Sequence, residues 1–127
     1  MRVSARRDMT EAVFATGVPF RAVSAARRNA FSRTMVHLMP QVAGIRRFGA
    51  AALDLAWVSA GRYDGYWELG IQHWDMAAGL LMVREAGGYV TSTGDEDPRE
   101  SGNVVAANPH LHARLREEVI QGMTPPT

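Results

Sequence analysis

Hydrophobic and polar residues alternate along this chain with two different periods. A two-residue alternation predicts a strand at 63–69, and short runs bounded by turn residues predict further strands around Val3 and at 11–16, 44–48, 89–91 and 104–107. Between them, apolar residues recur every three or four positions, which predicts helices at 22–39, 50–60, 75–86 and from 109 onward. Strands that alternate with helices indicate one α/β layered domain, which we expect to span residues 1–121 and to leave 122–127 as a frayed tail.

Residues that end or cap helices support these boundaries. Pro40 should stop the first helix, Gly61 the second and Gly87–Gly88 the third. Asn108 should cap the last helix, with a proline at its first position. Each helix has an apolar stripe that we expect to be buried: Val23, Ala26, Ala30, Thr34 and Leu38; Leu53 and Trp57; Met76, Leu80 and Val83; Leu111, Leu115 and Val119.

Two carboxylates flank the junction between the strand at 63–69 and the helix that follows it. Glu68 should lie at the end of the strand, and Asp75 in the first turn of the helix. Ligands of open α/β sheets bind just outside the carboxyl ends of strands, so this pair is a candidate metal and polyol site. The alternatives are structural: Asp75 as a helix cap, and Glu68 as a solvated surface group.

The longer string around these acids resembles a known family. Trp-Asp-Met-Ala-Ala-Gly at 74–79, followed by Arg-Glu-Ala-Gly-Gly at 84–88, is similar to the C-terminal signature of the inositol monophosphatase family. The resemblance implies a magnesium-dependent, lithium-sensitive sugar-phosphate phosphatase. It also implies the C-terminal α/β half of the layered inositol monophosphatase and fructose-bisphosphatase fold, with a mostly parallel sheet flanked by helices.

The resemblance covers nearly the whole chain and also shows what the chain lacks. Residues 46–62 resemble the strand and helix that precede the signature, and Asn108–Pro109 resembles the start of the last helix. Even Met1–Ser4 resembles a strand internal to the family. The family's remaining metal ligands are a Glu-Glu pair and an Asp-Pro-x-Asp-Gly-Thr segment of its N-terminal half, and no Asp-Pro-x-Asp-Gly-Thr segment occurs in these 127 residues. We therefore expect half an enzyme, inactive by itself.

The resemblance also implies roles for individual residues. Asp75 matches a Mg²⁺ ligand, and Glu68 matches the position that binds the hydroxyl groups of the substrate. Gly49, Ala50 and Ala51 match a backbone segment that approaches the substrate, and Trp74 could form a wall of the pocket. The family more often has Ser or Thr at position 50, so Ala50 removes one hydroxyl from this segment.

Composition bears on the cellular location of the protein and on its partners. The chain has no cysteine and no apolar run long enough to cross a membrane, so we expect a cytoplasmic protein. Residues 1–48 hold nine arginines against two acids, although the net charge of the whole chain is only +1. We interpret Arg27, Arg28 and Arg33 as a solvated helix face or a protein interface rather than a nucleic-acid site, because stacking aromatics are sparse there.

Other polar residues are weaker candidates for a metal-binding or catalytic site. His110 and His112 are two positions apart on a helix and face different directions, so they should not share a metal ion. Asp54 could pair with Arg46 or Arg47. The acidic run 95–97 should be a solvated loop.

Three functional alternatives stay open, as does the assembly of the chain. One is a histidinol-phosphate phosphatase of the same family, the second is a nucleotidase or bisphosphatase of the same superfamily, and the third is a non-catalytic binding module. We expect the chain to form a homo-oligomer or to pair with a missing N-terminal half. Met1–Ser4 is the expected open strand edge of such an assembly.

Overall fold

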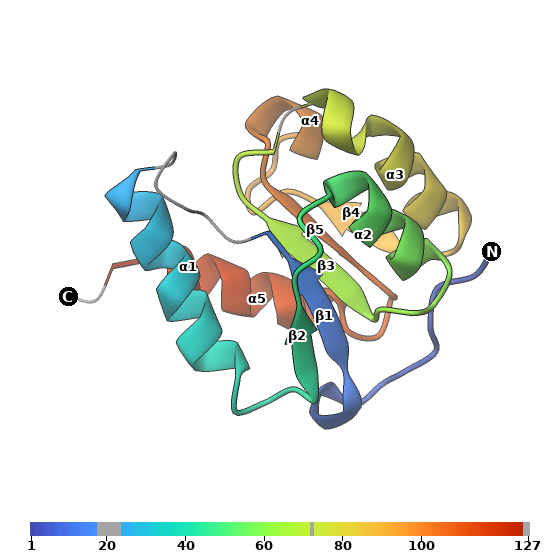
Figure 1. Cartoon of the computed structure of the whole chain (residues 1–127), viewed down its shortest axis with the longest axis horizontal. Coiled ribbons are helices and arrows are strands. Elements are labelled where there is room, and N and C mark those ends of the chain that lie inside the picture. Colours follow the sequence, from blue (N-terminus) through green and yellow to red (C-terminus); the bar gives the residue numbers. More distant parts are fainter. Residues whose placement is uncertain (18–23, 72, 126–127) are drawn as a thin grey trace.

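The computed structural model describes residues 1–17, 24–71 and 73–125, and for 73–75 the backbone alone. A five-stranded sheet lies between two layers of helices, with α2 and α3 on one face and α1 and α5 on the other (Figure 1). In chain order the elements are the 3-10 helix η1 (Met9–Glu11), β1 (Val13–Thr16), α1 (Ala25–Leu38), β2 (Gly44–Arg46), α2 (Ala51–Ser59), β3 (Gly65–Glu68), α3 (His73–Glu85), β4 (Tyr89–Thr91), α4 (Pro98–Ser101), β5 (Val104–Ala107) and α5 (His112–Met123).

The two-residue alternation of the strands produces two cores, one on each face of the sheet. On β3, for example, Tyr66 faces the α2–α3 layer and Trp67 the α1–α5 layer, and both are fully buried. The α2–α3 core contains Ala15, Leu55, Val58, Tyr63, Tyr66, Met76, Leu80, Val83, Val90, Val104 and Ala106. The α1–α5 core contains Ala12, Phe14, Leu38, Trp67, Val105, Ala107, Leu111, Leu115 and Val119.

The α/β layered fold is confirmed, but the sheet is mixed rather than mostly parallel. Its strand order is β2-β1-β3-β5-β4. Strand β1 runs parallel to β2 and β3, whereas β5 runs antiparallel to both of its neighbours, β3 and β4. The connection from β4 to β5 holds only the short α4, so the chain turns back at the same edge of the sheet. A reversal of this kind makes neighbouring strands antiparallel.

Two of the expected helix stripes are buried throughout, one is buried in part and one is wrong. Met76, Leu80 and Val83, the stripe of α5, and Ala30, Thr34 and Leu38 of α1 are all buried, whereas Ala26 is exposed and Val23 lies outside the described residues. On α2 the buried residues are Asp54, Leu55, Val58 and Ser59 instead of Leu53 and Trp57.

The reason is that α2 packs against the sheet and against α3 at once. Gly79 of α3 lies so close to Leu55 that a Cβ there would come within 2.7 Å of it. Trp57 is left at the rim, where its ring stacks edge-on against Phe48 with centroids 4.5 Å apart. Because α2 contacts both the sheet and α3, its buried face is rotated away from the stripe of Leu53 and Trp57 that spacing alone predicted.

The ends of two helices and one loop also differ from expectation. Asn108 accepts hydrogen bonds from the backbone N–H groups of His110 and Leu111, but the turn it caps precedes α5, which begins at His112. The helix continues to Met123, so two residues of the expected tail belong to it. The acidic run 95–97 ends by capping α4, because the Asp97 carboxylate accepts from Arg99 N.

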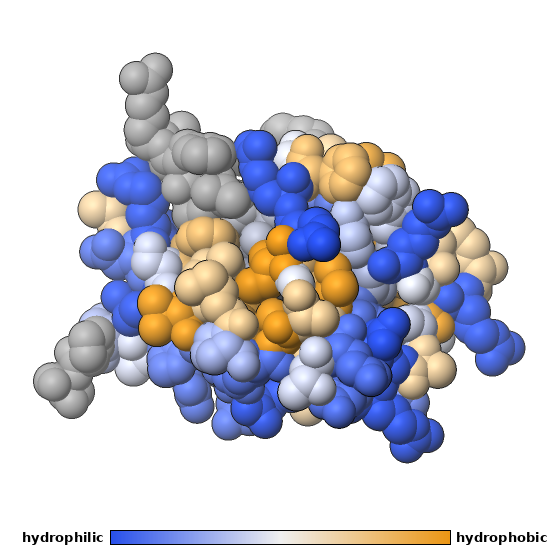
Figure 2. Space-filling view, turned by 60° about the horizontal axis from the view of Figure 1, so that its bottom comes forward, coloured by the Kyte–Doolittle hydropathy of each residue, from blue (hydrophilic) through white to orange (hydrophobic). Residues whose placement is uncertain are grey.

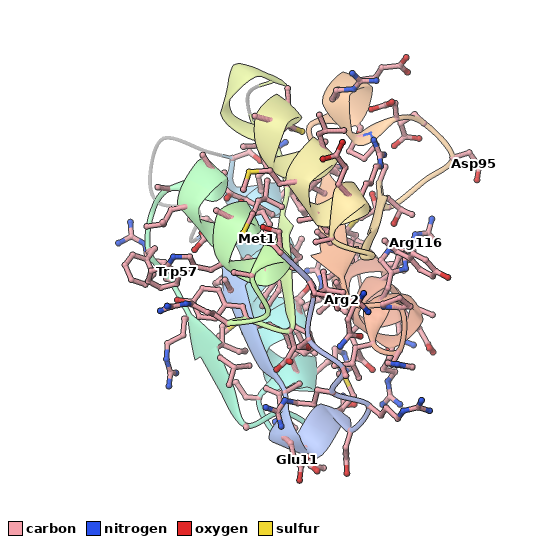
Figure 3. The ribbon with its side chains drawn as sticks, turned by 90° about the vertical axis from the view of Figure 1, so that its right-hand side faces the viewer. Met1, Arg2, Glu11, Trp57, Asp95 and Arg116 are labelled. Atoms are coloured by element: carbon pink, nitrogen blue, oxygen red, sulfur yellow. The ribbon has the colours of Figure 1, made fainter. Side chains whose placement is uncertain are left out.

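The expected strand at Met1–Ser4 is absent. Val3 makes one backbone hydrogen bond, from its N–H to the carbonyl of Ala86 at 3.0 Å, and no strand pairing. Figure 3 shows the segment running from Met1, beside α2 and α3, past Arg2 to Glu11 at the foot of the sheet. This segment is therefore a strap across the end of α3, and the open edges of the described sheet are β2 and β4.

A buried carboxylate fastens this strap to the sheet. Asp64, only 5% exposed, accepts hydrogen bonds from Ser4 Oγ at 2.6 Å and from the backbone N–H of Val13 at 2.8 Å. Arg6 pairs with the same carboxylate at 3.2 Å, and Asn108 donates to Ser4 Oγ at 2.9 Å. Together these bonds hold the strap against the starts of β1 and β3.

An apolar surface lies at the foot of the molecule. Figure 2 brings the lower part of Figure 1 forward and shows hydrophobic residues gathered in the middle of that face, with hydrophilic residues around them. The last turn of α1 and the edge strand β2 lie in this part of the fold (Figure 1). Val36 and Met39, at the end of α1, are 66% and 58% exposed.

Candidate functional site

A cavity lies at the carboxyl edge of the parallel strands, where the sequence places a ligand site. Strands β1 and β3 are parallel neighbours, so Gly17, which follows β1, and Glu68, which ends β3, meet at the same edge. The start of α2 lies beside them. The cavity measures about 380 Å³ and is lined by Gly17, Arg47, Gly49, Ala50, Ala51, Ala52, Glu68 and Ile71. It therefore joins Glu68 to the expected backbone segment 49–51.

Glu68 is held in a defined position on the cavity wall. Tyr66, two residues earlier on the same face of β3, donates its hydroxyl hydrogen to Oε1 of Glu68. The carboxylate lies over Gly17, where an added Cβ would come within 2.2 Å of the Glu68 carboxyl carbon. Only glycine leaves this room. The alternative view of Glu68 as a free surface group does not fit these contacts.

The first turn of α2 presents backbone donors to the cavity. The first four N–H groups of a helix have no partner within the helix. Here the cap residue is Ala50, whose side chain makes no capping hydrogen bond, and Ala51 and Ala52 line the cavity. Gly49 precedes them with φ at 85°, a left-handed conformation that favours glycine. Such an arrangement suits an anionic or hydroxyl-bearing ligand.

The other expected site residues lie outside the described side chains. Asp75 and Trp74 fall in the first turn of α3, as the sequence predicts for Asp75, but the directions of their side chains are not described. Among the described residues, no group of three or more His, Cys, Asp or Glu could hold a metal ion. The described part of the chain thus assembles no complete metal centre.

Sequence reasoning missed the role of Asp54. The expected ion pair with Arg46 or Arg47 does not form among the described residues. Asp54 is instead 1% exposed, and its Oδ1 has no hydrogen-bond partner in the described structure. Burial, and then the charge of Glu68, raise the pKa of Asp54 to about 6. The spacing of Ala51, Asp54 and Val58 along one helix face was the available signal.

A second cavity, of about 550 Å³, lies against the edge strand β4, lined in part by Ser92, Glu96 and Arg116. Its polar groups are largely engaged with one another. Ser92 donates to Glu96 at 2.7 Å, and Arg116 donates to the Ser92 carbonyl at 2.9 Å. Figure 3 shows Arg116 and Asp95 on the side of the molecule away from Trp57.

The two histidines near this region have different environments, and His110 lies in the turn before α5 rather than on the helix. His112 is buried and hydrogen-bonded to Thr91 Oγ1 at 2.9 Å, and burial lowers its pKa. His110 is exposed.

Across the described residues, no helix is long and apolar enough to span a membrane.

Comparison with known proteins agrees with the resemblance read from the sequence. The model of the inositol monophosphatase family matches residues 1–123. An inositol-1-monophosphatase from Rhizobium meliloti is 47% identical over 126 residues, which are 98% of this chain and 46% of the relative. The Nus factor SuhB of Pseudomonas aeruginosa is 45% identical over 128 residues, which are 100% of this chain and 47% of the relative.

A solved structure gives the same result for the fold. The extragenic suppressor protein suhB from Bartonella henselae superposes with a TM-score of 0.88 at 48% identity, over 95% of this chain and 46% of that one. The chain spans about half the length of the curated relatives it matches.

Proposed function

This chain belongs to the inositol monophosphatase family, and from that membership we propose that it forms the C-terminal part of a magnesium-dependent phosphatase. The substrate is an inositol monophosphate or a related polyol phosphate monoester. As part of this proposal we place the protein in the cytoplasm.

The observation that carries the proposal is the meeting of Glu68 with the first turn of α2 in one cavity. A polyol presents several hydroxyl groups, each of which both donates and accepts hydrogen bonds. Glu68, held by Tyr66, accepts from them. The N–H groups of the segment Gly49–Ala51 donate to them or to the phosphate. The cavity thus supplies recognition of the polyol.

Hydrolysis of the phosphate ester needs a metal site, and we propose that this chain supplies only part of that site. Magnesium binds hard oxygen ligands and neutralises charge on a phosphoryl group. We assign Asp75, at the start of α3, as one of its ligands. Since the described residues contain no group of three ligands, further carboxylates must come from the rest of the protein. We assign the binding of the polyol to this chain.

Substitutions in a protein that carries both halves test the assignment. Glu68→Gln removes a charged hydrogen-bond acceptor worth about 1.5–3 kcal/mol, which corresponds to a loss of roughly 10- to 150-fold in kcat/KM. Asp75→Asn should abolish magnesium-dependent phosphate release. Assays with inositol 1-phosphate and histidinol phosphate in parallel decide between the two substrate classes. Near-normal rates of Asp75→Asn at ordinary magnesium concentrations contradict the ligand assignment.

The purified 127-residue chain provides a second test. We expect it to release phosphate from inositol 1-phosphate at no more than trace rates, because one carboxylate does not fix the ions of a metal cluster. Robust magnesium-dependent turnover by this chain alone would refute the division of labour between the two halves.

A second candidate function is the one named for the Pseudomonas aeruginosa relative, that of a Nus factor. The basic N-terminal part, with Arg27 and Arg28 on α1, favours such a binding role, whereas Arg33 of the same helix donates a hydrogen bond to the Gly122 carbonyl. The test is to replace Glu68 and Asp75 together and to measure binding of the protein to its partner. Unchanged binding supports this role. Loss of partner binding in the same double variant argues against a function independent of the cavity.

A further inference from the structure

The loop between β3 and α3 connects the two carboxylates that the sequence singles out. Glu68 is the last residue of β3, and Asp75 lies in the first turn of α3. Ile71, within this loop, lines the same cavity as Glu68. The place of Asp75 relative to Glu68 therefore depends on what holds the loop.

Two hydrogen bonds join this loop to the turn that precedes β5. The backbone N–H of Gly70 donates to the side-chain Oδ1 of Asn103 at 3.1 Å. The N–H of Ile71 donates to the carbonyl of Gly102 at 2.8 Å. The ladder between β3 and β5 ends at Glu68, so the side chain of Asn103 supplies an acceptor where strand pairing has stopped.

The backbones of the loop and the turn approach closely. Gly102 has φ at 77°, in the left-handed region that favours glycine, and an added Cβ would come within 2.9 Å of the Ile71 carbonyl oxygen. A Cβ on Gly70 would overlap the guanidinium of Arg27 from α1. Figure 1 shows α4, which leads into this turn, beside the start of α3. The loop is thus packed against α1 and against the turn after α4.

The side chain of Asn103 is itself held in one orientation. Its Nδ2 donates to Thr93 Oγ1 at 3.4 Å, and its backbone N–H donates to Ser101 Oγ at 3.0 Å. Ser101 Oγ in turn lies 3.0 Å from Oγ of Ser92, which is 1% exposed. With its amide nitrogen engaged in this way, Asn103 presents its oxygen to Gly70.

We propose that Asn103 is a positioning residue for the candidate site, fixing the loop so that Asp75 keeps its place relative to Glu68. The inference rests on the proposed function, since it concerns the spacing between the polyol-binding carboxylate and the assigned magnesium ligand. Glu68 is also held in the sheet, so a loosened loop displaces the start of α3 rather than the end of β3. A misplacement of about 1 Å in a reacting group costs on the order of 10²-fold in rate.

The first test is kinetic and uses a protein that carries both halves. Asn103→Ala should lower kcat on inositol 1-phosphate by about 10- to 100-fold and raise the Mg²⁺ concentration for half-maximal rate, while KM changes by less than about 3-fold. Asn103→Asp keeps an oxygen for the Gly70 N–H and should restore most of kcat. Gly102→Ala, which pushes on the loop from the turn, should reproduce the pattern of Asn103→Ala.

Two control variants separate positioning from a general loss of stability. Asn29→Ala changes an exposed asparagine of α1 and should match the wild type. Asp64→Asn weakens the hydrogen bonds before the opposite end of β3, so it should lower stability in urea without changing the magnesium requirement. Equal losses of kcat in Asp64→Asn and Asn103→Ala overturn the proposal, as does an unchanged kcat and magnesium requirement in Asn103→Ala.

Amide hydrogen exchange in the same protein gives a readout that does not depend on activity. Asn103→Ala should speed exchange at Gly70 by about 10-fold or more, and at Ile71 by less, because Ile71 keeps the Gly102 carbonyl. Unchanged exchange at Gly70 overturns the proposal. Faster exchange in a protein whose wild type releases no phosphate from polyol phosphates supports the bond between the loop and Asn103 and refutes the proposed function.

Discussion

Replacing Asp54 by asparagine should stabilise this protein at neutral and alkaline pH. The pKa of Asp54 is raised from 3.8 to about 6, mainly by burial. Between these two values the folded state keeps a proton that the unfolded state has already released. The free energy of unfolding must therefore fall as pH rises through this window, and above about pH 6 the full cost is present.

The size of the effect follows from the shift. A difference of about two pKa units, at ~1.4 kcal/mol per unit, corresponds to about 3 kcal/mol. The cavity beside Glu68 admits solvent that screens part of this, so about 2–3 kcal/mol is expected. That is a large share of the ~5–15 kcal/mol that separates folded from unfolded domains.

Urea unfolding, followed by tryptophan fluorescence at about pH 4 and about pH 8, measures the cost of ionising Asp54 in the folded state. The quantity of interest is the change in free energy of unfolding between the two pH values, compared between wild type and Asp54→Asn. Contributions from other groups, such as His112, cancel in this comparison. So does any pH-independent cost of burying an amide.

Asp95→Asn is the matched control, since Asp95 projects from an exposed loop on the side of the molecule away from Trp57 of α2 (Figure 3). The wild type should lose about 2–3 kcal/mol more than Asp54→Asn between the two pH values, and Asp95→Asn should behave like the wild type. An equal pH dependence in wild type and Asp54→Asn would refute the reasoning, because it would mean that Asp54 ionises in the fold as it does in water.

Two further predictions concern the ends of the fold. Asp64→Ala should destabilise the chain by about 2–4 kcal/mol in urea unfolding, because it leaves the Val13 N–H and the strap without their acceptor. Asp95→Ala, on an exposed loop, is the control, and equal midpoints for both variants would contradict the role of Asp64. The chain should also self-associate through the apolar surface at the end of α1 and the edge strand β2. Val36→Asp should lower the mass measured by light scattering over a dilution series, whereas Leu81→Asp on α3 should not. A monomeric wild type at all concentrations would rule this surface out.

The sequence alone determined the local elements and the place of the candidate site. Apolar periodicity, short apolar runs and turn residues are local features, so they located every strand of the observed sheet and the buried stripes of α3 and α5. The same local pattern placed Glu68 at a strand end and Asp75 in the first turn of a helix. Parallel neighbouring strands then brought Glu68 to the edge where the cavity lies.

What only the tertiary structure decided depends on contacts between distant segments. The antiparallel insertion of β5 follows from a chain reversal after β4, which periodicity does not register. The strap at Met1–Ser4 is fixed by Asp64, some 60 residues away. The burial of Asp54 results from α2 packing on the sheet and on α3 together. The spacing of Asp54 with Ala51 and Val58 places it on one face of α2, but which face is buried is set by the layers that close over the helix rather than by its neighbours in the chain.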